Sequence, residues 1–383
     1  MKPIRVLSIF GTRPEAVKMA PVVRRLNHTQ GIESLVCVTA QHRQMLDQVL
    51  DLFTIQPDRD LNLMKPDQSL PQLTADIFTY LDPVLHELKP DWVLVQGDTT
   101  TVMAAALLAY YHRVKVGHVE AGLRTGDKWQ PFPEEVNRRV AGVVADLHFA
   151  PTEWSRQNLL KENVPSDKIV VTGNTVIDAL KFVADQPANQ QVLELLEKIG
   201  LSGDPPGTVE QPRLILVTAH RRENFGAPLE QICLALRDLA ELYQERVRIV
   251  YPVHLNPNVQ EPVYRLLEGV PGIILLPPLD YLPLVHLLKR RSVLLTDSGG
   301  LQEEAPGLGV PVLVLREVTE RPEGVEAGTV CLVGTHRERL VEQTRRLLDD
   351  PLAHASMAQA VNPYGDGHAA ERIVQALINE GVE

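Results

Sequence analysis

Short apolar runs, each followed by a helix-like pattern, recur along the 383-residue chain and restrict its possible folds more than any other feature. They predict strands at residues 4–10, 34–39, 92–96, 115–119, 147–150 and 169–172, and again at 213–219, 247–253, 272–276, 292–296, 311–315 and 330–333. Runs such as WVLVQ and LILVTA are nearly continuous in apolar residues, which is typical of parallel strands covered on both faces. Because helical segments such as PEAVKMAPVVRRL alternate with these runs, we predict an α/β protein with doubly wound sheets.

The alternation breaks once, between residues 185 and 212. This stretch holds one helical segment, QQVLELLEKIG, and then LSGDPPGTVEQPR, whose glycines and prolines predict a loop. A chain of this length is suited to two domains, so we predict one at 1–172 and another at 173–365. The final segment, 366–383, reads as a helix with Ile373, Val374, Leu377 and Ile378 on one face.

Composition narrows the class of protein and its partners. The net charge of −11 argues against nucleic acid or an anionic membrane as a partner, although a local basic site could still bind a small anion. The three cysteines are widely spaced and form no CxxC pair, which predicts reduced thiols and neither a zinc site nor a redox pair. No apolar stretch approaches the ~20 residues of a membrane helix, and the N-terminal run reads as a first strand, so we expect a soluble cytoplasmic protein.

Polar and ionisable residues crowd the positions just after the predicted strands. In open parallel sheets, ligands bind beyond the carboxyl ends of the strands. The segments found there include GTRPEAVK, TAQHRQML, GDTTT, EAGLRTGDKWQPFPEEVNRR, HRREN, HLNPN and DSGGLQEE. The sequence therefore predicts a ligand site to which the loops after both series of strands contribute polar and ionisable side chains.

The segment DSGGLQEE, residues 297–304, is the most specific of these signals. Ser298 could cap a helix, while Gly299 and Gly300 would let a diphosphate approach the backbone amides closely. Glu304 lies about 9 Å further along a helix, at roughly 1.5 Å per residue, where it could accept hydrogen bonds from a ribose. A capped helix with exposed acids is the alternative interpretation. Two arginines after the next strand, Arg316 and Arg321, could neutralise the diphosphate.

The segment GTRPEAVK places Arg13 and Lys18 near the start of the first helix, where an anion is favoured. A helix start with solvated charges would explain the same residues. The segment matches neither GxGxxG nor the P-loop pattern, so no NAD or other cofactor is predicted.

Several carboxylates follow strands in the first half of the chain, among them Asp98, Glu120 and Glu134. Carboxylates that share one cleft are costly unless they titrate or meet developing positive charge. Taken singly, each could equally be a solvated or capping acid. His220 opens a strand-end loop in the second half, where structural and catalytic roles are equally compatible with it. The histidines have no ligand-like spacing, so no metal site is predicted.

These segments resemble, in order and over nearly the whole chain, the bacterial non-hydrolysing UDP-N-acetylglucosamine 2-epimerases. The resemblance rests on GTRPEAVK, TAQHRQML, VQGDTTT, HVEAGLRTGD, PFPEEVNRR, FAPT, GNTVIDAL, TAHRREN, PVHLNPNV, TDSGGLQEEAP and VLREVTERPEG. It implies a glycosyltransferase-B-type arrangement of two Rossmann-like domains with a cleft between them. It also implies a final helix that crosses back to the first domain, and a homodimer.

The resemblance implies that the enzyme interconverts UDP-GlcNAc and UDP-ManNAc without a cofactor, for surface polysaccharide synthesis. UDP would be eliminated to give 2-acetamidoglucal and then re-added with the proton on the opposite face of C2. Because the C2 proton is not next to a carbonyl, its removal needs a cation-like C1, which carboxylates stabilise. A hydrolysing epimerase that releases UDP and ManNAc, a retaining glycosyltransferase and a non-enzymatic nucleotide-sugar sensor are the alternatives.

The resemblance also implies roles for individual residues. The acids and histidine that match catalytic positions are Asp98, Glu120, Glu134 and His220. Residues that match substrate or UDP contacts are Arg13, Lys18, Leu279, Leu284, Ser298, Gly299, Gly300, Glu304 and Arg321. Residues that match a second, activating UDP-GlcNAc site are Gln41, Gln44, Arg221 and His254. Asp67 occupies a segment where other members can place an arginine, which would weaken a phosphate contact at that second site.

Overall fold

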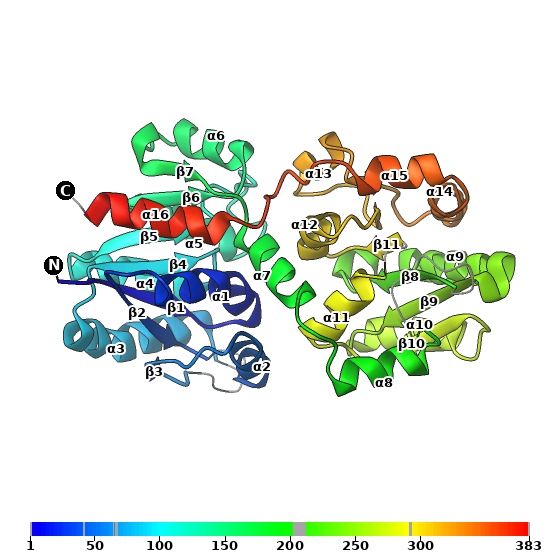
Figure 1. Ribbon diagram of the computed structural model, residues 1–383, viewed down its shortest axis with the longest axis horizontal. Helices are drawn as coiled ribbons and strands as arrows, with labels where there is room; N and C mark the ends of the chain where they lie inside the picture. The colour runs from blue at the N-terminus through cyan, green and yellow to red at the C-terminus, as the bar shows by residue number, and fades with distance from the viewer. Residues whose placement is uncertain are drawn as a thin grey trace. The chain divides into compact units, whose positions relative to one another are not determined.

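The computed structural model describes residues 2–40, 43–63, 65, 68–201, 212–290 and 293–381. The chain forms two compact units (Figure 1): Met1–Ala179 together with Tyr364–Glu383, and Leu180–Pro363. The chain enters the second unit along helix α7 (Thr175–Ala184) and returns to the first at Tyr364. The predicted loop at 201–213 falls mostly on residues 202–211, which lie outside the described residues.

The first unit is built on a parallel sheet with strand order β3-β2-β1-β4-β5-β6-β7. Its strands are β1 (Ile4–Phe10), β2 (Ile32–Val38), β3 (Arg59–Asp60), β4 (Trp92–Gln96), β5 (Lys115–Val119), β6 (Leu147–Ala150) and β7 (Ile169–Val171). Its helices are α1 (Arg13–Asn27), α2 (Arg43–Phe53), α3 (Leu70–Leu88), α4 (Thr100–Tyr111), α5 (Glu134–Val144), α6 (Glu153–Lys161) and α16 (Ala369–Gly381). Leu7 and Val93 from the central strands pack with Leu81 of α3 and Ala105 of α4 in one core.

The second unit repeats this architecture, with strand order β10-β9-β8-β11-β12-β13 and parallel pairing throughout. Its strands are β8 (Arg213–Thr218), β9 (Val247–Pro252), β10 (Ile273–Leu276), β11 (Val293–Thr296), β12 (Val312–Val314) and β13 (Val330–Leu332). Its helices are α8 (Gln190–Lys198), α9 (Ala227–Tyr243), α10 (Pro257–Leu267), α11 (Tyr281–Leu288), α12 (Gly299–Gly307), α13 (Pro322–Glu326), α14 (Arg337–Asp349) and α15 (Pro351–Ala358). Core clusters lie on both faces of the sheet. Ile215 and Leu216, two successive residues of β8, point to opposite faces and belong to different clusters.

The predicted α/β class and the parallel strands are confirmed, and each predicted strand is present close to its expected bounds. The short edge strand β3 was missed because Arg59 and Asp60 are polar and belong to no apolar run. The final helix is also confirmed: Ile373, Val374 and Leu377 are buried on α16, which packs against α1.

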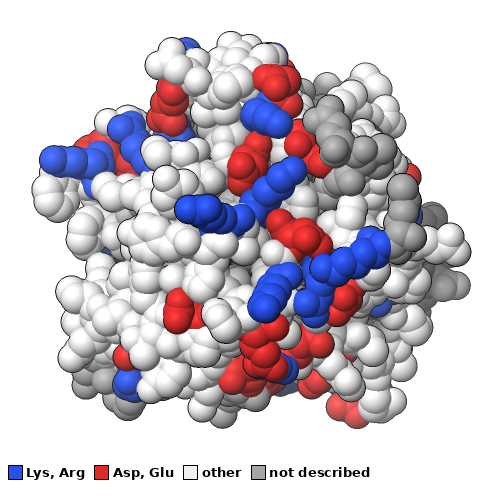
Figure 2. Space-filling model, turned by 90° about the vertical axis from the view of Figure 1, so that its left-hand side faces the viewer, with Lys and Arg blue, Asp and Glu red and all other residues white. Residues whose placement is uncertain are grey.

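The surface charges, the cysteines and the lengths of the helices bear on the class of protein. One face of the molecule carries Lys and Arg side chains interleaved with Asp and Glu (Figure 2). Cys37 and Cys233 are buried free thiols, and Cys331 is a half-buried one. Among the helices that the structure describes, none has both the length and the apolar character needed to cross a membrane.

Two buried histidines face each other across neighbouring strands of the first unit, where His118 of β5 pairs in register with His148 of β6. His118 Nε2–H donates to the carbonyl of Gly97 at 2.7 Å, and this hydrogen bond raises the pKa of His118 by less than burial lowers it. Burial lowers the pKa of His118 to about 4, with a smaller lowering by the charge of His148. Burial also lowers the pKa of His148 to about 4, with a smaller lowering by Arg124.

These histidines predict a loss of stability in mild acid. An unfolded imidazole has a pKa of about 6.5, so between pH 6.5 and about 4 the unfolded chain binds more protons than the folded one. Their stabilisation is complete above about pH 6.5 and is lost as the pH falls toward 4. Urea unfolding followed by circular dichroism should show a shallower acid loss for His148→Gln than for the wild type.

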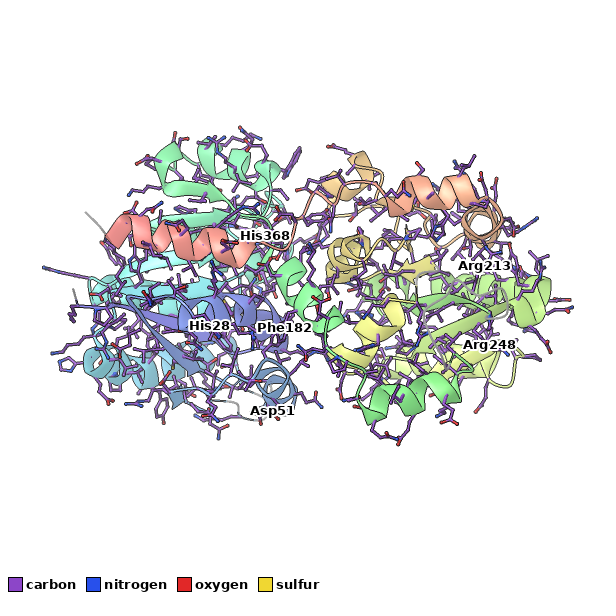
Figure 3. The ribbon with its side chains drawn as sticks, viewed as in Figure 1. His28, Asp51, Phe182, Arg213, Arg248 and His368 are labelled. Atoms are coloured by element: carbon purple, nitrogen blue, oxygen red, sulfur yellow. The ribbon has the colours of Figure 1, made fainter. Side chains whose placement is uncertain are left out.

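His28, an exposed residue directly after α1 (Figure 3), provides the matched control. His28→Gln should keep the wild-type pH dependence of the free energy of unfolding. An identical acid loss in His148→Gln and the wild type would remove His148 from this account.

Candidate active site

Each sheet has one switch point, at which consecutive crossovers turn to opposite sides: β1 next to β4 in the first unit, and β8 next to β11 in the second. Loops diverge at such points, which leaves room for a ligand beyond the strand ends. The segments that follow these four strands are those starting at Gly11, Gly97, Ala219 and Asp297. The residues singled out from the sequence therefore gather at two such edges, one in each unit.

Glu120 follows β5 directly and is held by three side chains. Its Oε1 accepts from Lys18 Nζ at 2.5 Å and from Asn174 Nδ2 at 2.9 Å, while its Oε2 accepts from Gln96 Nε2 at 2.5 Å. Glu120 has a φ of 64°, a left-handed backbone that costs a non-glycine residue on the order of 1 kcal/mol. Glu120 is buried, and one cation and two amide donors favour the anionic form of such a carboxylate.

Asp98 lies beyond the end of β4 and contacts helix α5. Its Oδ2 accepts from Arg138 Nη2 at 2.6 Å, and its backbone carbonyl accepts from Asn137 Nδ2 at 2.9 Å. Burial raises the pKa of Asp98, and the negative charge of Glu120 raises it further, against the opposing charges of Arg138 and Lys18. Asp98 is thus more easily protonated than an ordinary aspartate, which suits a group that exchanges protons.

The adjacent acids Glu134 and Glu135 at the start of α5 have different surroundings. Glu135 is fully buried and accepts from the amides of Thr125 and Gly126 at 3.1 and 3.3 Å, so it anchors the loop before the helix. Glu134 Oε2 is also buried but has no hydrogen-bond partner within the described part of the chain. Since Arg138 lies one turn further along α5, Glu134 shares the helix face that meets Asp98.

The first helix supplies the basic residues of this edge. Glu15 closes the start of α1 by accepting from the amides of Gly11 and Thr12 at 3.0 and 2.7 Å. Burial raises the pKa of Glu15, although these hydrogen bonds lower it. Arg13, the first residue of α1, is half-buried, and no described side chain pairs with it. Arg13 and Lys18 therefore bring positive charge to the edge that holds the catalytic candidates Asp98 and Glu120.

In the second unit, His220 lies beside a fully buried carboxylate, Asp297. Asp297 Oδ2 accepts from the amides of His220 and Arg221 at 2.8 Å each and from Asn224 Nδ2 at 3.0 Å. The His220 Nδ1 atom lies 3.5 Å from Asp297 Oδ1, and the ring stacks on His254 with centroids 5.3 Å apart. Asp297 thereby fixes the backbone at His220 and places a negative charge beside its ring.

Asp297 was missed as a site residue in the sequence. An acid at the end of a central apolar run, one strand over from His220, was the available signal. Burial lowers the pKa of His220, and His254 and Arg221 lower it further, while the charge of Asp297 raises it.

Helix α12 begins at Gly299, and Ser298 occupies its N-cap position. The prediction that the Ser298 side chain caps the helix is wrong, because Ser298 makes no side-chain capping bond; its amide instead donates to Thr296 Oγ1 at 3.0 Å. A Cβ built on Gly299 would lie 2.7 Å from Arg321 Nη1, so only glycine lets the guanidinium lie this close to the helix start. Open amides and an adjacent arginine make this end of α12 suited to a phosphate group.

The two acids of α12 have distinct partners. Glu303, to which the sequence assigned no role, accepts from Arg321 Nε at 2.5 Å and thereby places the guanidinium near Gly299. Glu304 lies deeper along the helix, and its Oε2 accepts from the Tyr281 hydroxyl at 2.8 Å. Of the two acids, Glu303 therefore orients the arginine, and Glu304 is hydrogen-bonded to Tyr281.

Three further candidates, Leu279, Leu284 and Arg316, belong to the second unit. Leu279 and Leu284 are partly buried and pack on the same core cluster as Leu301 and Ala305 of α12. Arg316, considered as a second diphosphate partner, is paired with Glu223 instead. Of the residues expected at a second nucleotide-sugar site, Arg221 and His254 adjoin His220, whereas Gln41 and Asp67 lie outside the described residues and the Gln44 side chain is not described.

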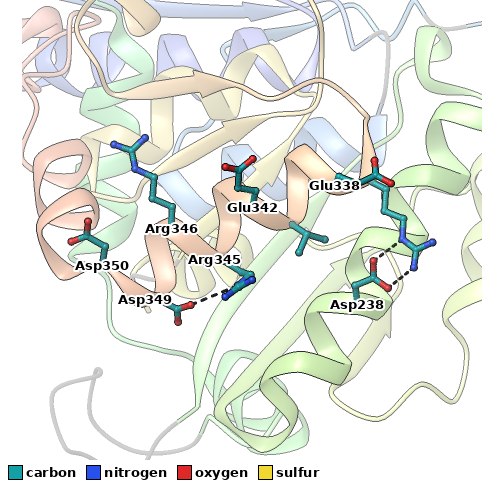
Figure 4. Close-up of a pocket in the computed structure, with 9 residues that line it drawn as sticks. Asp238, Glu338, Glu342, Arg345, Arg346, Asp349 and Asp350 are labelled. Atoms are coloured by element: carbon teal, nitrogen blue, oxygen red, sulfur yellow. Dashed lines mark hydrogen bonds and ion pairs between the residues drawn. The ribbon is translucent and has the colours of Figure 1, made fainter.

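Metal-binding groups and the hollow along α14 are the other possible sites in the described part of the chain. In the described residues, no group of three His, Cys, Asp or Glu side chains could hold a metal ion. A hollow of about 720 Å³ lies along α14 (Figure 4), where Arg337 pairs with Asp238 through two bonds of 2.6 Å. Its lining comes from helices α9 and α14 and the start of α15, with no strand end, so it is separate from the two edges described above.

Two doubly wound parallel sheets, each with ionisable side chains gathered beyond its switch point, define a ligand-binding α/β protein built from two Rossmann-like units. The family model described as "UDP-N-acetylglucosamine 2-epimerase" matches residues 24–378. The UDP-N-acetylglucosamine 2-epimerase of Yersinia pestis is 56% identical over 379 residues, covering 99% of this chain and 100% of that protein. The chain belongs to the UDP-N-acetylglucosamine 2-epimerase family and is an isomerase.

Solved structures agree with this assignment. The crystal structure of UDP-GlcNAc 2-epimerase from Neisseria meningitidis bound to UDP-GlcNAc has a TM-score of 0.87 and 49% identity, and the match covers 98% of this chain and 100% of that one. The glycosyltransferase of kitacinnamycin has a TM-score of 0.64 at 12% identity, with coverage of 100% and 99%, and shares the fold alone.

The contact between His220 and Asp297 predicts opposite effects of two substitutions. Asp297→Asn should lower the pKa of His220, because the charge that raises it is removed while an oxygen remains for the backbone amides. His254→Gln should raise the same pKa, because a neighbour that lowers it is removed. An NMR titration of the His220 ring protons measures both, and an unchanged pKa in Asp297→Asn would contradict the role of Asp297.

Proposed function

We propose that the enzyme interconverts UDP-GlcNAc and UDP-ManNAc without hydrolysing them, through elimination of UDP and its re-addition to 2-acetamidoglucal. The observation that carries the proposal is that acidic groups and a phosphate-binding helix start lie at two different sheet edges. One edge holds Asp98, whose pKa is raised by burial, and Glu120, which is paired with Lys18, and the other holds a helix start with an arginine beside it. Family membership and the Neisseria structure bound to UDP-GlcNAc support the substrate.

The departing group is stabilised by the second unit. As the bond from C1 to the diphosphate oxygen breaks, its electron pair stays with UDP and negative charge grows on the diphosphate. The amides at the start of α12 and the guanidinium of Arg321 oppose that charge. Leu279 and Leu284 supply apolar surface for the uracil, and Glu304 accepts from the ribose hydroxyls.

The sugar chemistry is assigned to the first unit. Glu120, held as an anion by Lys18, stabilises the cation-like C1. The C2 proton leaves to a carboxylate, and the electrons of its bond form the C1–C2 double bond of the glucal. Asp98, whose pKa is raised, and Glu134, with its unpartnered oxygen, are the groups suited to accept a proton and return one to the other face. His220 completes the set as a polarising or proton-carrying group.

The proposal is tested by incubating the enzyme with UDP-GlcNAc in deuterated water and recording proton NMR spectra. UDP-ManNAc and UDP-GlcNAc that carry deuterium at C2 are expected, because the abstracted proton exchanges with solvent before it is returned. Stoichiometric UDP and free ManNAc would show a hydrolysing enzyme instead, and transfer to an added sugar would show a glycosyltransferase.

Glu120→Gln tests the catalytic role of Glu120 in the same experiment. The substitution should reduce C2 exchange by about 100-fold or more while UDP affinity stays near that of the wild type, because Glu120 acts on the sugar alone. The exposed acid Glu153, replaced by Gln in the same way, should leave exchange unchanged. Wild-type exchange in Glu120→Gln would remove this residue from the catalytic set.

Glu304→Ala should weaken UDP binding about tenfold or more and slow the chemical step less, since a charged hydrogen bond contributes about 1.5–3 kcal/mol. Isothermal titration calorimetry with UDP measures the affinity. Tyr281→Phe is the matched control, because it removes only the 2.8 Å bond between Tyr281 and Glu304. Equal UDP affinity in Glu304→Ala and the wild type would refute the contact with the ribose.

The assembly and location complete the proposal. Exposed tyrosines cluster on α3 and α4, where Tyr110 and Tyr111 have ring centroids 6.2 Å apart and Tyr80 lies on the neighbouring helix, and a second copy of the chain would cover such a surface. We place the homodimer in the cytoplasm, where free thiols stay reduced, and its UDP-ManNAc in surface polysaccharide synthesis. Gln41, Gln44, Arg221 and His254 form the proposed site for a second, activating UDP-GlcNAc.

A further inference from the structure

Asn174, which lies directly before α7, has a fixed side-chain orientation. Its Oδ1 accepts from the backbone amide of Val176 at 3.1 Å, and its backbone N–H donates to the carbonyl of Tyr364 at 2.6 Å. The side chain is buried and has one acceptor end and one donor end. Because the acceptor end is engaged by the helix start, the NH₂ group must point the other way, where it donates to Glu120 Oε1 at 2.9 Å.

The backbone around Asn174 is fixed as well. Gly173 has a φ of 87° and Gly365 a φ of 135°, and a Cβ built on Gly173 would lie 3.2 Å from the Gly365 Cα atom. The two backbones therefore touch, and both positions require glycine. These are the segments along which the chain leaves the first unit through α7 and returns to it at Tyr364.

We propose that Asn174 is a positioning residue for Glu120, an inference that rests on the proposed function of that carboxylate. Lys18 Nζ and Asn174 Nδ2 approach the same oxygen of Glu120. Lysine is a flexible point charge, whereas the Asn174 side-chain amide is held through its Oδ1 by the Val176 amide and its backbone is held by Tyr364, so Asn174 sets the direction in which the carboxylate faces. The two chain segments between the units are thereby connected to the acid that meets the sugar.

Asn174→Asp separates this role from simple helix capping. Aspartate is an equally good cap and retains an oxygen for the Val176 amide, but it replaces the donor to Glu120 by a second negative charge. The charged and titratable groups that face Glu120 are Lys18 from α1, Asp98 after β4 and His118 within β5. None of these is altered by the substitution.

At pH 8, kcat for Asn174→Asp should fall about 10- to 100-fold, with UDP affinity near its wild-type value. The ratio of wild-type to variant kcat should shrink as the pH is lowered, because the introduced carboxyl group becomes protonated and its O–H can donate to Glu120. Asn174→Ser keeps a capping oxygen and adds no charge, so its loss of kcat should be independent of pH.

Asn189→Asp is the matched control, because Asn189 caps α8 in the same way, accepting from the Val192 amide at 2.9 Å. It should leave kcat unchanged at every pH. Full activity in both Asn174 variants would overturn the inference, as would a loss of kcat in Asn174→Ser that parallels a loss of thermal stability. If the wild type binds UDP but shows no C2 exchange, the proposed function fails and takes this inference with it.

Discussion

Parallel pairing of strands that are buried on both faces is the constraint on which the rest of this structure depends. Because each strand in a sheet runs the same way, the loops that follow their carboxyl ends collect at one edge. The central strands are apolar along most of their length, so polar side chains are displaced to those loops. Reversal of strand order next to β1 and β8 then separates neighbouring loops and exposes the groups between them.

Burial of acids is the second organising feature. The desolvation cost of each buried carboxylate is offset either by backbone amides or by a cation. Glu135 and Asp297 accept from backbone amides and hold loops in place. Glu120 and Glu303 pair with the cations Lys18 and Arg321, as a buried charge requires. Acids that look alike in the sequence therefore divide into anchors, positioning groups and candidates for proton transfer.

Much of the fold could be predicted from the sequence, because strand periodicity and strand-end polarity are local properties of the chain. The helix at the C-terminus was found for the same reason, since the spacing of Ile373, Val374 and Leu377 marks a buried face. The candidate site was predicted as a set of residues but not as a set of contacts. Asp297 and the role of Glu303 were missed, because their partners lie 77 and 18 residues away in the chain.

The sequence by itself determined that this chain forms parallel α/β sheets, and its ordered motifs placed the chain among the UDP-N-acetylglucosamine 2-epimerases. Those properties depend on residue types and short spacings. Only the tertiary structure decided which acid each cation and amide meets: Lys18 and Asn174 with Glu120, Arg138 with Asp98, and Arg321 with Glu303. The physical reason is that desolvation and charge pairing depend on distances of a few ångströms between segments far apart in the chain.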